Sequence, residues 1–412
     1  MHDIVFTAEA LALRDKARAI AEKYVRPNAS RLDKSQEYNW DATRAVAEAG
    51  LFGVFIPREY GGHGGSILSL CLVVEELAKA DSGYGVAFAV NALGSFPLLT
   101  GGTEAQKQKW LPQIARGEKL VAFCLSEKFA GSDAGGLAVR ALPEEDGSWT
   151  IRGEKKWTTN GGVADLYSVF AVTDPGSRSR RISAFLVEKG TPGFKIGKVE
   201  DKMGIRCVPV VETQFDGVRV PAENLLGGRP GMGFKHAMMT LDLARPGVAA
   251  QAVGAAQGAL DYANLYASRR RQFGAAINSF QMVQQMIADM AMQTEAARML
   301  VYSAAAAADK NAADLNKLAA MAKCFATDAA VKVATDACQI FGGYGFMEDY
   351  PIAKFYRDAK ILQIYEGTNQ VQRMVIARNV AREIDRLEHL AKYIPTEVQD
   401  RFGAPVEEGA SA

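Results

Sequence analysis

Apolar and polar positions alternate with two different periods along this chain, and the period changes twice. Residues 1–119 follow the helical period, with Leu13, Ala17 and Ile20 on one face of the first expected helix. Near residue 120 the pattern changes to the period of two that is typical of strands, and it keeps that period to about residue 229. From residue 230 the helical period returns. The pattern therefore predicts a mainly α protein with a β domain inserted between two helical regions.

The first helical region contains long apolar runs that indicate buried helices. Helices are expected over residues 40–49, 69–80 and 84–99, with residues 81–83 as the break between the last two. The Gly-rich segment 55–65 lacks the GxGxxG spacing and the preceding strand of a dinucleotide site. We therefore interpret that segment as a structural turn.

The central region alternates short apolar runs with turn residues. Strands are expected over residues 148–152, 166–172 and 182–187. The turn signals between them are Asp146-Gly147, Asp174-Pro175-Gly176 and Thr191-Pro192-Gly193. Such spacing indicates a small, barrel-like β domain.

The last region consists of long helical patterns with short connections, which is typical of a helix bundle. Helices are expected over residues 238–268, 280–308, 314–341 and 369–393. Pro246-Gly247 interrupts the first of them, so a kink or a helix boundary is expected there. The expected division is an N-terminal helical domain (1–119), a β domain (120–229), a C-terminal four-helix bundle (230–394) and a polar tail (395–412).

One short stretch between two apolar patterns carries a lone carboxylate. Glu366 follows an apolar run and precedes Gly367, which frees the backbone for a tight turn. Thr368 is a candidate N-cap, with Val371 and Val375 at helical spacing behind it. Glu366 is thus expected on a loop between two helices, facing a cavity. The alternative is a solvated glutamate in the first turn of a helix, where the helix dipole favours it.

Composition and charge exclude several classes of protein. The 412 residues are 48% hydrophobic and 23% charged, with a net charge of +1, so neither a nucleic-acid groove nor a polybasic membrane surface is indicated. No uninterrupted apolar run approaches the roughly 20 residues that span a bilayer, and no membrane association is expected. The five cysteines and four histidines are scattered without metal-ligand spacing, so we expect reduced thiols, no metal and a cytoplasmic location.

Six short motifs follow one another in a fixed order along nearly the whole chain. Each motif alone is weak, but six in order are specific. They are Ala122–Glu127 with Ala130–Asp133, Trp157–Gly161, Leu241–Arg245, Arg270–Gly274, Gln339–Gly343 and Tyr365–Thr368. In these motifs and their order the chain resembles the acyl-CoA dehydrogenase family.

The resemblance implies FAD as the cofactor and α,β-dehydrogenation of an acyl-CoA thioester as the reaction. Glu366 is then the base that removes the Cα proton while hydride passes from Cβ to flavin N5. In the family, a flavin ribityl hydroxyl and the backbone N–H of the catalytic glutamate hold the thioester oxygen. An isovaleryl-CoA dehydrogenase-like branch places its glutamate just before the arginine of the LDxxR motif, and that position here is Ala244. Glu366 is therefore the expected base.

The resemblance also assigns the remaining site residues. Those expected to bind FAD are Phe123, Leu125, Ser126, Ser132, Trp157, Thr158, Thr159, Arg270, Gln272, Phe273, Gln281, Gln339, Gly342, Gly343, Thr368 and Gln370. Those expected to bind the acyl-CoA are Ser132, Leu241, Asp242, Arg245, Tyr365 and Gly367. Because FAD sites in this family are shared between subunits, a homodimer or homotetramer is implied. Electrons are expected to pass to an electron-transferring flavoprotein.

Several of these residues have simpler interpretations. Trp157 could be a core tryptophan of the β domain, and Asp242 with Arg245 could be an i,i+3 ion pair on a helix. The run 269–271 could be a solvated basic patch, and Gly342-Gly343 could end a helix. A flavin oxidase or an enoyl-CoA reductase on the same scaffold is an alternative function, and a non-catalytic relative is another.

Two features bear on the substrate and the cofactor loop. Glutaryl-CoA dehydrogenases carry an arginine after Ser-Gly-Tyr, but here Gly85 stands after Tyr84, which argues against a dicarboxylic substrate. The mostly apolar segment 86–99 fits an aliphatic or alicyclic acyl group, whose length the sequence leaves open. Lys128-Phe129 stands where the family commonly has Pro-Gly, so that turn must form differently.

Overall fold

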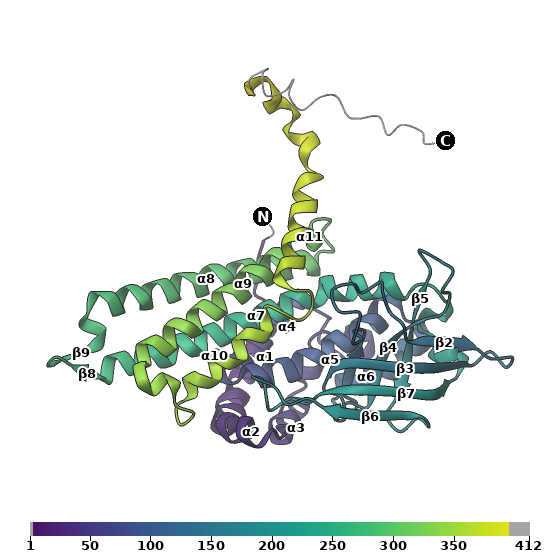
Figure 1. Ribbon diagram of the computed structural model, residues 1–412, viewed down its shortest axis with the longest axis horizontal. Coiled ribbons are helices and arrows are strands. Elements are labelled where there is room, and N and C mark those ends of the chain that lie inside the picture. Colours follow the sequence, from purple (N-terminus) through teal and green to yellow (C-terminus); the bar gives the residue numbers. More distant parts are fainter. Residues whose placement is uncertain (1–2, 395–412) are drawn as a thin grey trace.

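The computed structural model describes residues 3–394, and the predicted tail 395–412 lies outside these residues. A bundle of long helices forms one end of the molecule and a curled β-sheet forms the other (Figure 1). Helices α2 Ala29–Ser35 and α3 Trp40–Glu48 lie below the bundle near its middle in this view. The mainly α fold with an inserted β domain is therefore confirmed.

The N-terminal region is helical, as expected, and its two longest helices are in the core. The helices are α1 Ala8–Ile20, α2 Ala29–Ser35, α3 Trp40–Glu48, α4 Ile67–Ala80, α5 Ser82–Gly101 and α6 Glu104–Ala115. Asp81 separates α4 from α5 and caps α5, since its Oδ1 accepts a hydrogen bond of 2.7 Å from Gly83 N. The predicted break between these two helices is thus confirmed.

Helix α5 is the one described helix that is long and apolar enough to cross a membrane. The expectation that no apolar run reaches the length of a bilayer span was therefore wrong for α5. However, 78% of its most apolar window is buried inside the protein. Its hydrophobicity is that of a core helix packed on α4, α7 and β1.

The β domain is one seven-stranded sheet. Its strands are β1 Val121–Cys124, β2 Arg140–Pro143, β3 Trp149–Thr159, β4 Leu166–Val172, β5 Ile182–Glu188, β6 Phe194–Val199 and β7 Val210–Val220. They lie in the order β1-β4-β2-β3-β7-β6, with β5 antiparallel to β4. Every residue of β4 is buried, so both of its faces are covered. β1 runs parallel to β4 and leads into the loop that contains Ser126 and Ser132.

The C-terminal helices form the bundle. They are α7 Gly233–Arg269, α8 Gln281–Asp309, α9 Leu315–Phe341, α10 Pro351–Leu362 and α11 Asn369–Ala381, with a short hairpin of β8 Arg271–Gln272 and β9 Ala275–Ala276 between α7 and α8. Of the two expectations at Pro246, a kink or a helix boundary, the boundary was wrong, because α7 continues through it. α7 packs on α4, α5, α8 and α9, and this packing outweighs the roughly 3 kcal/mol cost of an internal proline.

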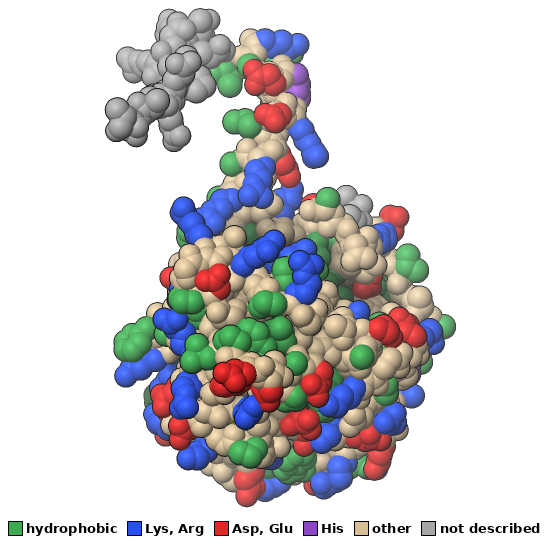
Figure 2. All heavy atoms as spheres, turned by 90° about the vertical axis from the view of Figure 1, so that its right-hand side faces the viewer, with side chains coloured by type: hydrophobic (Ala, Val, Ile, Leu, Met, Phe, Trp, Pro, Cys, Tyr) green, Lys and Arg blue, Asp and Glu red, His purple; other side chains and the backbone are tan. Residues whose placement is uncertain are grey.

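The last predicted helix is also interrupted. α11 ends at Ala381, and residues 384–393 form a separate 3-10 helix whose apolar side chains Ile384, Leu387 and Tyr393 are exposed. This C-terminal arm stands clear of the rest of the molecule (Figure 2). The expected single helix over 369–393 was therefore wrong in its second half, where almost every side chain is exposed.

Candidate active site

A cleft with an empty volume of about 1470 Å³ lies where the β domain meets the bundle. Its walls come from α5, from the strand ends and loops of the β domain, from the first half of α7, and from the turn between α10 and α11. Glu366 lines this cleft. The predicted loop position facing a cavity is thus confirmed, and the alternative of a solvated glutamate is wrong.

The turn that carries Glu366 has an unusual backbone. Glu366 has φ 53° and Gly367 has φ 92°, so two consecutive residues adopt left-handed conformations. Such a conformation costs a non-glycine residue about 1–3 kcal/mol and is typical of functional sites. Thr368 caps α11 as predicted, since its hydroxyl accepts a hydrogen bond of 3.3 Å from Val371 N.

Side chains from other helices hold this turn through its carbonyl groups. Gln372 Nε2 donates to Glu366 O at 3.3 Å and to Gly367 O at 3.2 Å. Arg245 Nε approaches Glu366 O at 3.4 Å from α7. Lys323 Nζ donates to Gly367 O at 2.9 Å from α9. Side chains of α7, α9 and α11 therefore fix the backbone that positions the carboxylate of Glu366.

The carboxylate of Glu366 is left without a partner. Its Oε2 is buried and makes no hydrogen bond. Burial raises the pKa of Glu366 to about 7, although Arg245 and Lys323 act in the opposite direction. A carboxylate whose pKa lies near neutrality can both exist ionised and accept a proton there, as a general base requires.

The backbone N–H of Glu366 also finds no acceptor among residues 3–394. An unpaired amide beside a cleft is an available donor for a ligand oxygen. The turn thus presents a base and a hydrogen-bond donor from one residue.

Helix α5 forms an apolar wall of the cleft. Val86, Val90 and Leu93 face the cleft at helical spacing. Asn91, a polar residue on this helix, does not line the cleft, and its Oδ1 accepts a bond of 2.9 Å from Val121 N that ties α5 to β1. Its role is structural.

The β domain supplies aromatic, apolar and hydroxyl groups. Five residues predicted to contact FAD line the cleft together, namely Phe123, Leu125, Ser126, Trp157 and Thr159. Trp157 is 50% exposed and has φ 61°, so the interpretation as a core tryptophan is wrong. The side chain of Thr158 is instead buried, with its hydroxyl 3.4 Å from that of Thr213. Only its backbone remains available to a cofactor.

The loop after β1 places Ser132 on the cleft and makes its turn without Pro-Gly. Glu127 and Ala130 exchange two backbone hydrogen bonds of 3.0 and 3.1 Å, which close a tight turn around Lys128 and Phe129. Phe129 is 91% exposed, and the ammonium of Lys128 lies 5.3 Å from its ring centre. The two backbone hydrogen bonds therefore hold this turn in place of the Pro-Gly pair common in the family.

Helix α7 contributes the motif residues Leu241 and Arg245 to the cleft, whereas Asp242 lies behind them. Asp242 Oδ1 accepts bonds of 2.8 Å from both Arg245 Nη1 and Asn316 Nδ2. The i,i+3 ion pair is thus present, but it is largely buried rather than on the surface. Burial raises the pKa of Asp242, while the arginine opposes that change.

Tyr365 reaches the cleft from the same turn, and a buried chain of polar groups holds its hydroxyl. That hydroxyl donates to Gln251 Oε1, and Gln251 Nε2 donates to Ser82 O at 2.8 Å. Sequence reasoning missed Gln251 and Lys323. The available signal was a lone polar side chain in an alanine-rich, otherwise apolar helical stretch.

The remaining predicted cofactor residues lie at the other end of the bundle. Arg270, Gln272, Gly342 and Gly343 line a second hollow, near the β8–β9 hairpin, and Phe273, Gln281 and Gln339 are exposed at the same end (Figure 1). Arg245 and Arg270 are 25 residues apart on one helix, which is roughly 37 Å. Thr368 and Gln370 are near the cleft but do not line it. The predicted FAD residues that line the cleft and those at the far end of the bundle therefore cannot contact the same FAD molecule within one chain.

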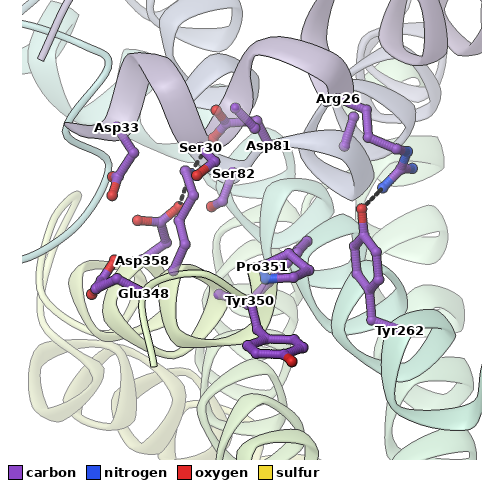
Figure 3. A pocket seen from close by; sticks show the side chains of 14 residues that line it. Arg26, Ser30, Asp33, Asp81, Ser82, Tyr262, Glu348, Tyr350, Pro351 and Asp358 are labelled. Carbon is purple, nitrogen blue, oxygen red and sulfur yellow. Dashed lines mark hydrogen bonds and ion pairs between the residues drawn. The ribbon is translucent and has the colours of Figure 1, made fainter. Parts of the chain in front are cut away.

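A third pocket, shown in Figure 3, is lined by charged side chains that form ion pairs. Asp33, Asp81 and Asp358 approach it from α2, from the start of α5 and from α10. The buried ammonium of Lys354 bonds Asp81 at 2.6 Å and Asp358 at 2.5 Å. This network joins α10, and hence the Glu366 turn, to the N-terminal region. Among residues 3–394 no cluster of side chains could hold a metal ion.

Comparison with known proteins gives one consistent result. Models of the acyl-CoA dehydrogenase N-terminal, middle and C-terminal domains match residues 7–118, 122–218 and 231–381. A short-chain-specific acyl-CoA dehydrogenase of Megasphaera elsdenii is 47% identical over 363 residues, which is 87% of this chain and 94% of the relative. The structure of butyryl-CoA dehydrogenase from the same organism superposes with a TM-score of 0.89 at 45% identity, covering 92% of this chain and all of the other. A chain from a structure of the electron transferring flavoprotein of Acidaminococcus fermentans gives 0.90 at 47% identity, with the same coverage.

Proposed function

The chain belongs to the acyl-CoA dehydrogenase family and is an acyl-CoA dehydrogenase, and we propose that Glu366 is its catalytic base. In this proposal, Glu366 takes the Cα proton of an acyl-CoA thioester as Cβ loses hydride, which leaves the 2-enoyl-CoA. The observation that supports it most strongly is a buried carboxylate oxygen without a partner, on a strained turn that lines an apolar cleft. Ala244, at the position of the alternative base, has no acidic group.

The difference in acidity between the substrate and Glu366 shows how much the site must stabilise the transition state. A thioester α-proton is less acidic than a carboxylic acid by on the order of ten pKa units, roughly 14 kcal/mol. Burial, which raises the pKa of Glu366 to about 7, covers only part of this gap. A hydrogen bond from Glu366 N–H to the thioester oxygen would contribute about 3 kcal/mol more. The rest of the roughly 14 kcal/mol gap is overcome only if hydride leaves Cβ at the same time as the proton leaves Cα.

Members of this family are flavoproteins that use FAD, which, when bound, accepts that hydride. The cleft fits such a group, because Trp157 is half exposed beside it and Ser126 and Thr159 offer hydroxyl groups. We propose that Phe123, Leu125, Ser126, Ser132, Trp157, Thr159 and the backbone of Thr158 hold FAD in this chain.

The second group of predicted cofactor residues supports an assembly of subunits. Arg270, Gln272, Phe273, Gln281, Gln339, Gly342 and Gly343 would reach the FAD of a neighbouring chain, and Thr368 with Gln370 would contact the cofactor near the cleft. Arg270 supplies the paired donors that a pyrophosphate requires. We propose a homodimer as the minimum and a homotetramer as the complete enzyme. The domain boundaries at 119/120, 229/230 and 394/395 stay predictions.

For the substrate we propose a short-chain acyl-CoA. The two Megasphaera elsdenii relatives act on short-chain acyl groups by their names, and the α5 wall here is apolar. Leu241, Arg245, Ser132, Tyr365 and Gly367 would contact the thioester and pantetheine, with Asp242 orienting Arg245. Gly85 packs so closely on Ala78 that a side chain there would overlap α4, which is consistent with a substrate that has no distal carboxylate. An electron-transferring flavoprotein is the proposed acceptor, and the cytoplasm the proposed location.

An anaerobic titration with thioesters of graded length tests this proposal. The purified protein should be yellow, and butyryl-CoA should bleach it with one equivalent per active site. Acyl-CoAs of about twelve or more carbons should bleach it more slowly. Protein that takes up no FAD, or that bleaches without any acyl-CoA, would overturn the proposal. Rapid peroxide formation in air would instead assign the oxidase function.

A further inference from the structure

Lys323 is a buried ammonium directly behind the turn that carries Glu366. Its side chain is fully buried on α9, between alanines at 319, 320, 322 and 326 that are also buried. Within the described residues it forms no ion pair with a carboxylate. A buried, unpaired ammonium costs several kcal/mol, so its retention needs a compensating role.

The ammonium of Lys323 bonds the catalytic turn and the start of α11. Its Nζ donates to Gly367 O at 2.9 Å and to Asn369 Oδ1 at 2.9 Å. Asn369 is itself held, because its Nδ2 donates to Thr327 Oγ1 at 2.8 Å and to Asp328 Oδ1 at 2.7 Å. The ammonium therefore connects α9 to the residue after Glu366 and to the first residue of α11.

The other charges that face this turn are mostly neutralised. Arg245 of α7 is paired with Asp242 at 2.8 Å, and Arg373 of α11 with Asp328 of α9 at 2.6 Å. On the β-domain side, Lys156 is paired with Glu200 at 3.1 Å and with Glu212 at 2.5 Å. No charged side chain from α5 lines the cleft.

One more cation lines the cleft. Arg378, on α11, has no carboxylate partner among the described residues, but it stands about 13 Å along that helix from Asn369. Lys360, on α10, also has no carboxylate partner among the described residues, but it is exposed and donates to Gln363 Oε1 at 2.8 Å. Lys323 is the buried cation without a carboxylate partner that bonds the turn itself.

We propose that Lys323 is a positioning residue for Glu366: it clamps the left-handed turn through the Gly367 carbonyl and places a free positive charge behind the carboxylate. This inference rests on the proposed role of Glu366 as base. The cation keeps part of the base ionised despite its burial. It makes no hydrogen bond to Glu366 Oε2, so that oxygen stays free for the substrate.

The titration behaviour of both groups agrees with this geometry. Lys323 opposes the effect of burial on the pKa of Glu366. Burial in turn lowers the pKa of Lys323 to about 8, so the ammonium is still mainly charged at pH 7. Removing the charge should raise the pKa of Glu366, and its ionised fraction at pH 7 should fall.

Two substitutions separate the clamp from the charge. Lys323→Gln keeps an N–H donor for Gly367 O but removes the charge, whereas Lys323→Met removes both. Lys332→Gln is the matched control, because Lys332 lies on the same helix in an exposed ion pair with Asp336. The rate of anaerobic flavin reduction by saturating butyryl-CoA is measured between pH 5.5 and 9, together with FAD content and substrate affinity.

We expect Lys323→Gln to retain FAD and to bind butyryl-CoA within about threefold of wild type. Its pH–rate inflection should move up by about one unit, so that the rate at pH 7 falls about fivefold and recovers at pH 9. Lys323→Met should also lose rate at pH 9, by about tenfold or more, because the turn is no longer held. Lys332→Gln should match wild type throughout.

An unshifted inflection in Lys323→Gln, or loss of folding and FAD in that variant, would overturn the inference, because either outcome assigns Lys323 to stability alone. Failure of the wild type to be reduced by any acyl-CoA would refute the proposed function instead. The two failures are therefore distinguishable.

Discussion

Replacing Glu366 by glutamine should stabilise the protein, and should do so only at pH values above about 4.5, where the carboxylate of the unfolded chain is ionised. The folded state raises the pKa of Glu366 from the usual 4.5 to about 7, chiefly through burial. The folded protein therefore binds this proton more tightly than the unfolded chain does. Stability conferred by the group is complete below pH 4.5 and is lost as pH rises through about 7.

The size of the effect follows from that difference. A shift of 2.5 pKa units corresponds to at most about 3 kcal/mol, since each unit is worth about 1.4 kcal/mol. Glu366→Gln is nearly isosteric and carries no charge. The variant should thus match wild type below about pH 4, exceed its stability by about 1.4 kcal/mol at pH 5.5, and exceed it by up to about 3 kcal/mol at pH 8.

Thermal unfolding of FAD-bound wild type and variant at pH 5.5 and pH 8 measures this difference. Glu144→Gln, an exposed glutamate near the β2–β3 turn, is the control and should show no pH-dependent gain. A melting temperature of Glu366→Gln that is equal to or below that of wild type at pH 8 would refute the reasoning. It would mean that the carboxylate is solvated or paired.

Two further substitutions test the framework of the site. Lys354→Met leaves Asp81 and Asp358 buried without their cation and should lower the free energy of unfolding by about 3–5 kcal/mol, whereas a loss below 1 kcal/mol in chemical denaturation would count against the network. Gly367→Ala places a methyl group against Gln372 at φ 92°, and should slow flavin reduction at least tenfold with FAD content unchanged, while wild-type rates would show that the turn tolerates a side chain.

Sequence periodicity predicted most of the architecture, because long amphipathic and alternating patterns report which face is buried. It failed where tertiary packing determines whether a helix continues or ends. Pro246 was expected to kink or end a helix, and contacts of α7 with its neighbours carry the helix past it. Residues 384–393 kept a helical pattern, yet most of their side chains are exposed and they form a separate 3-10 segment.

The site was predictable only in part, for a similar reason. Glu366, Gly367 and Thr368 are adjacent in the sequence, so their local turn chemistry was visible there. The unpaired oxygen of Glu366 and the support from Gln251 and Lys323 depend on helices that are more than 40 residues away along the chain. Their importance comes from burial, which a single sequence does not reveal.

Stopped-flow measurement of anaerobic flavin reduction in Glu366→Gln tests the central claim most directly. With FAD bound and butyryl-CoA saturating, the variant should be reduced about 10²–10⁴-fold more slowly than wild type, since it retains the cleft but has lost the base. Reduction within tenfold of the wild-type rate would contradict the account, because another group would then be removing the α-proton.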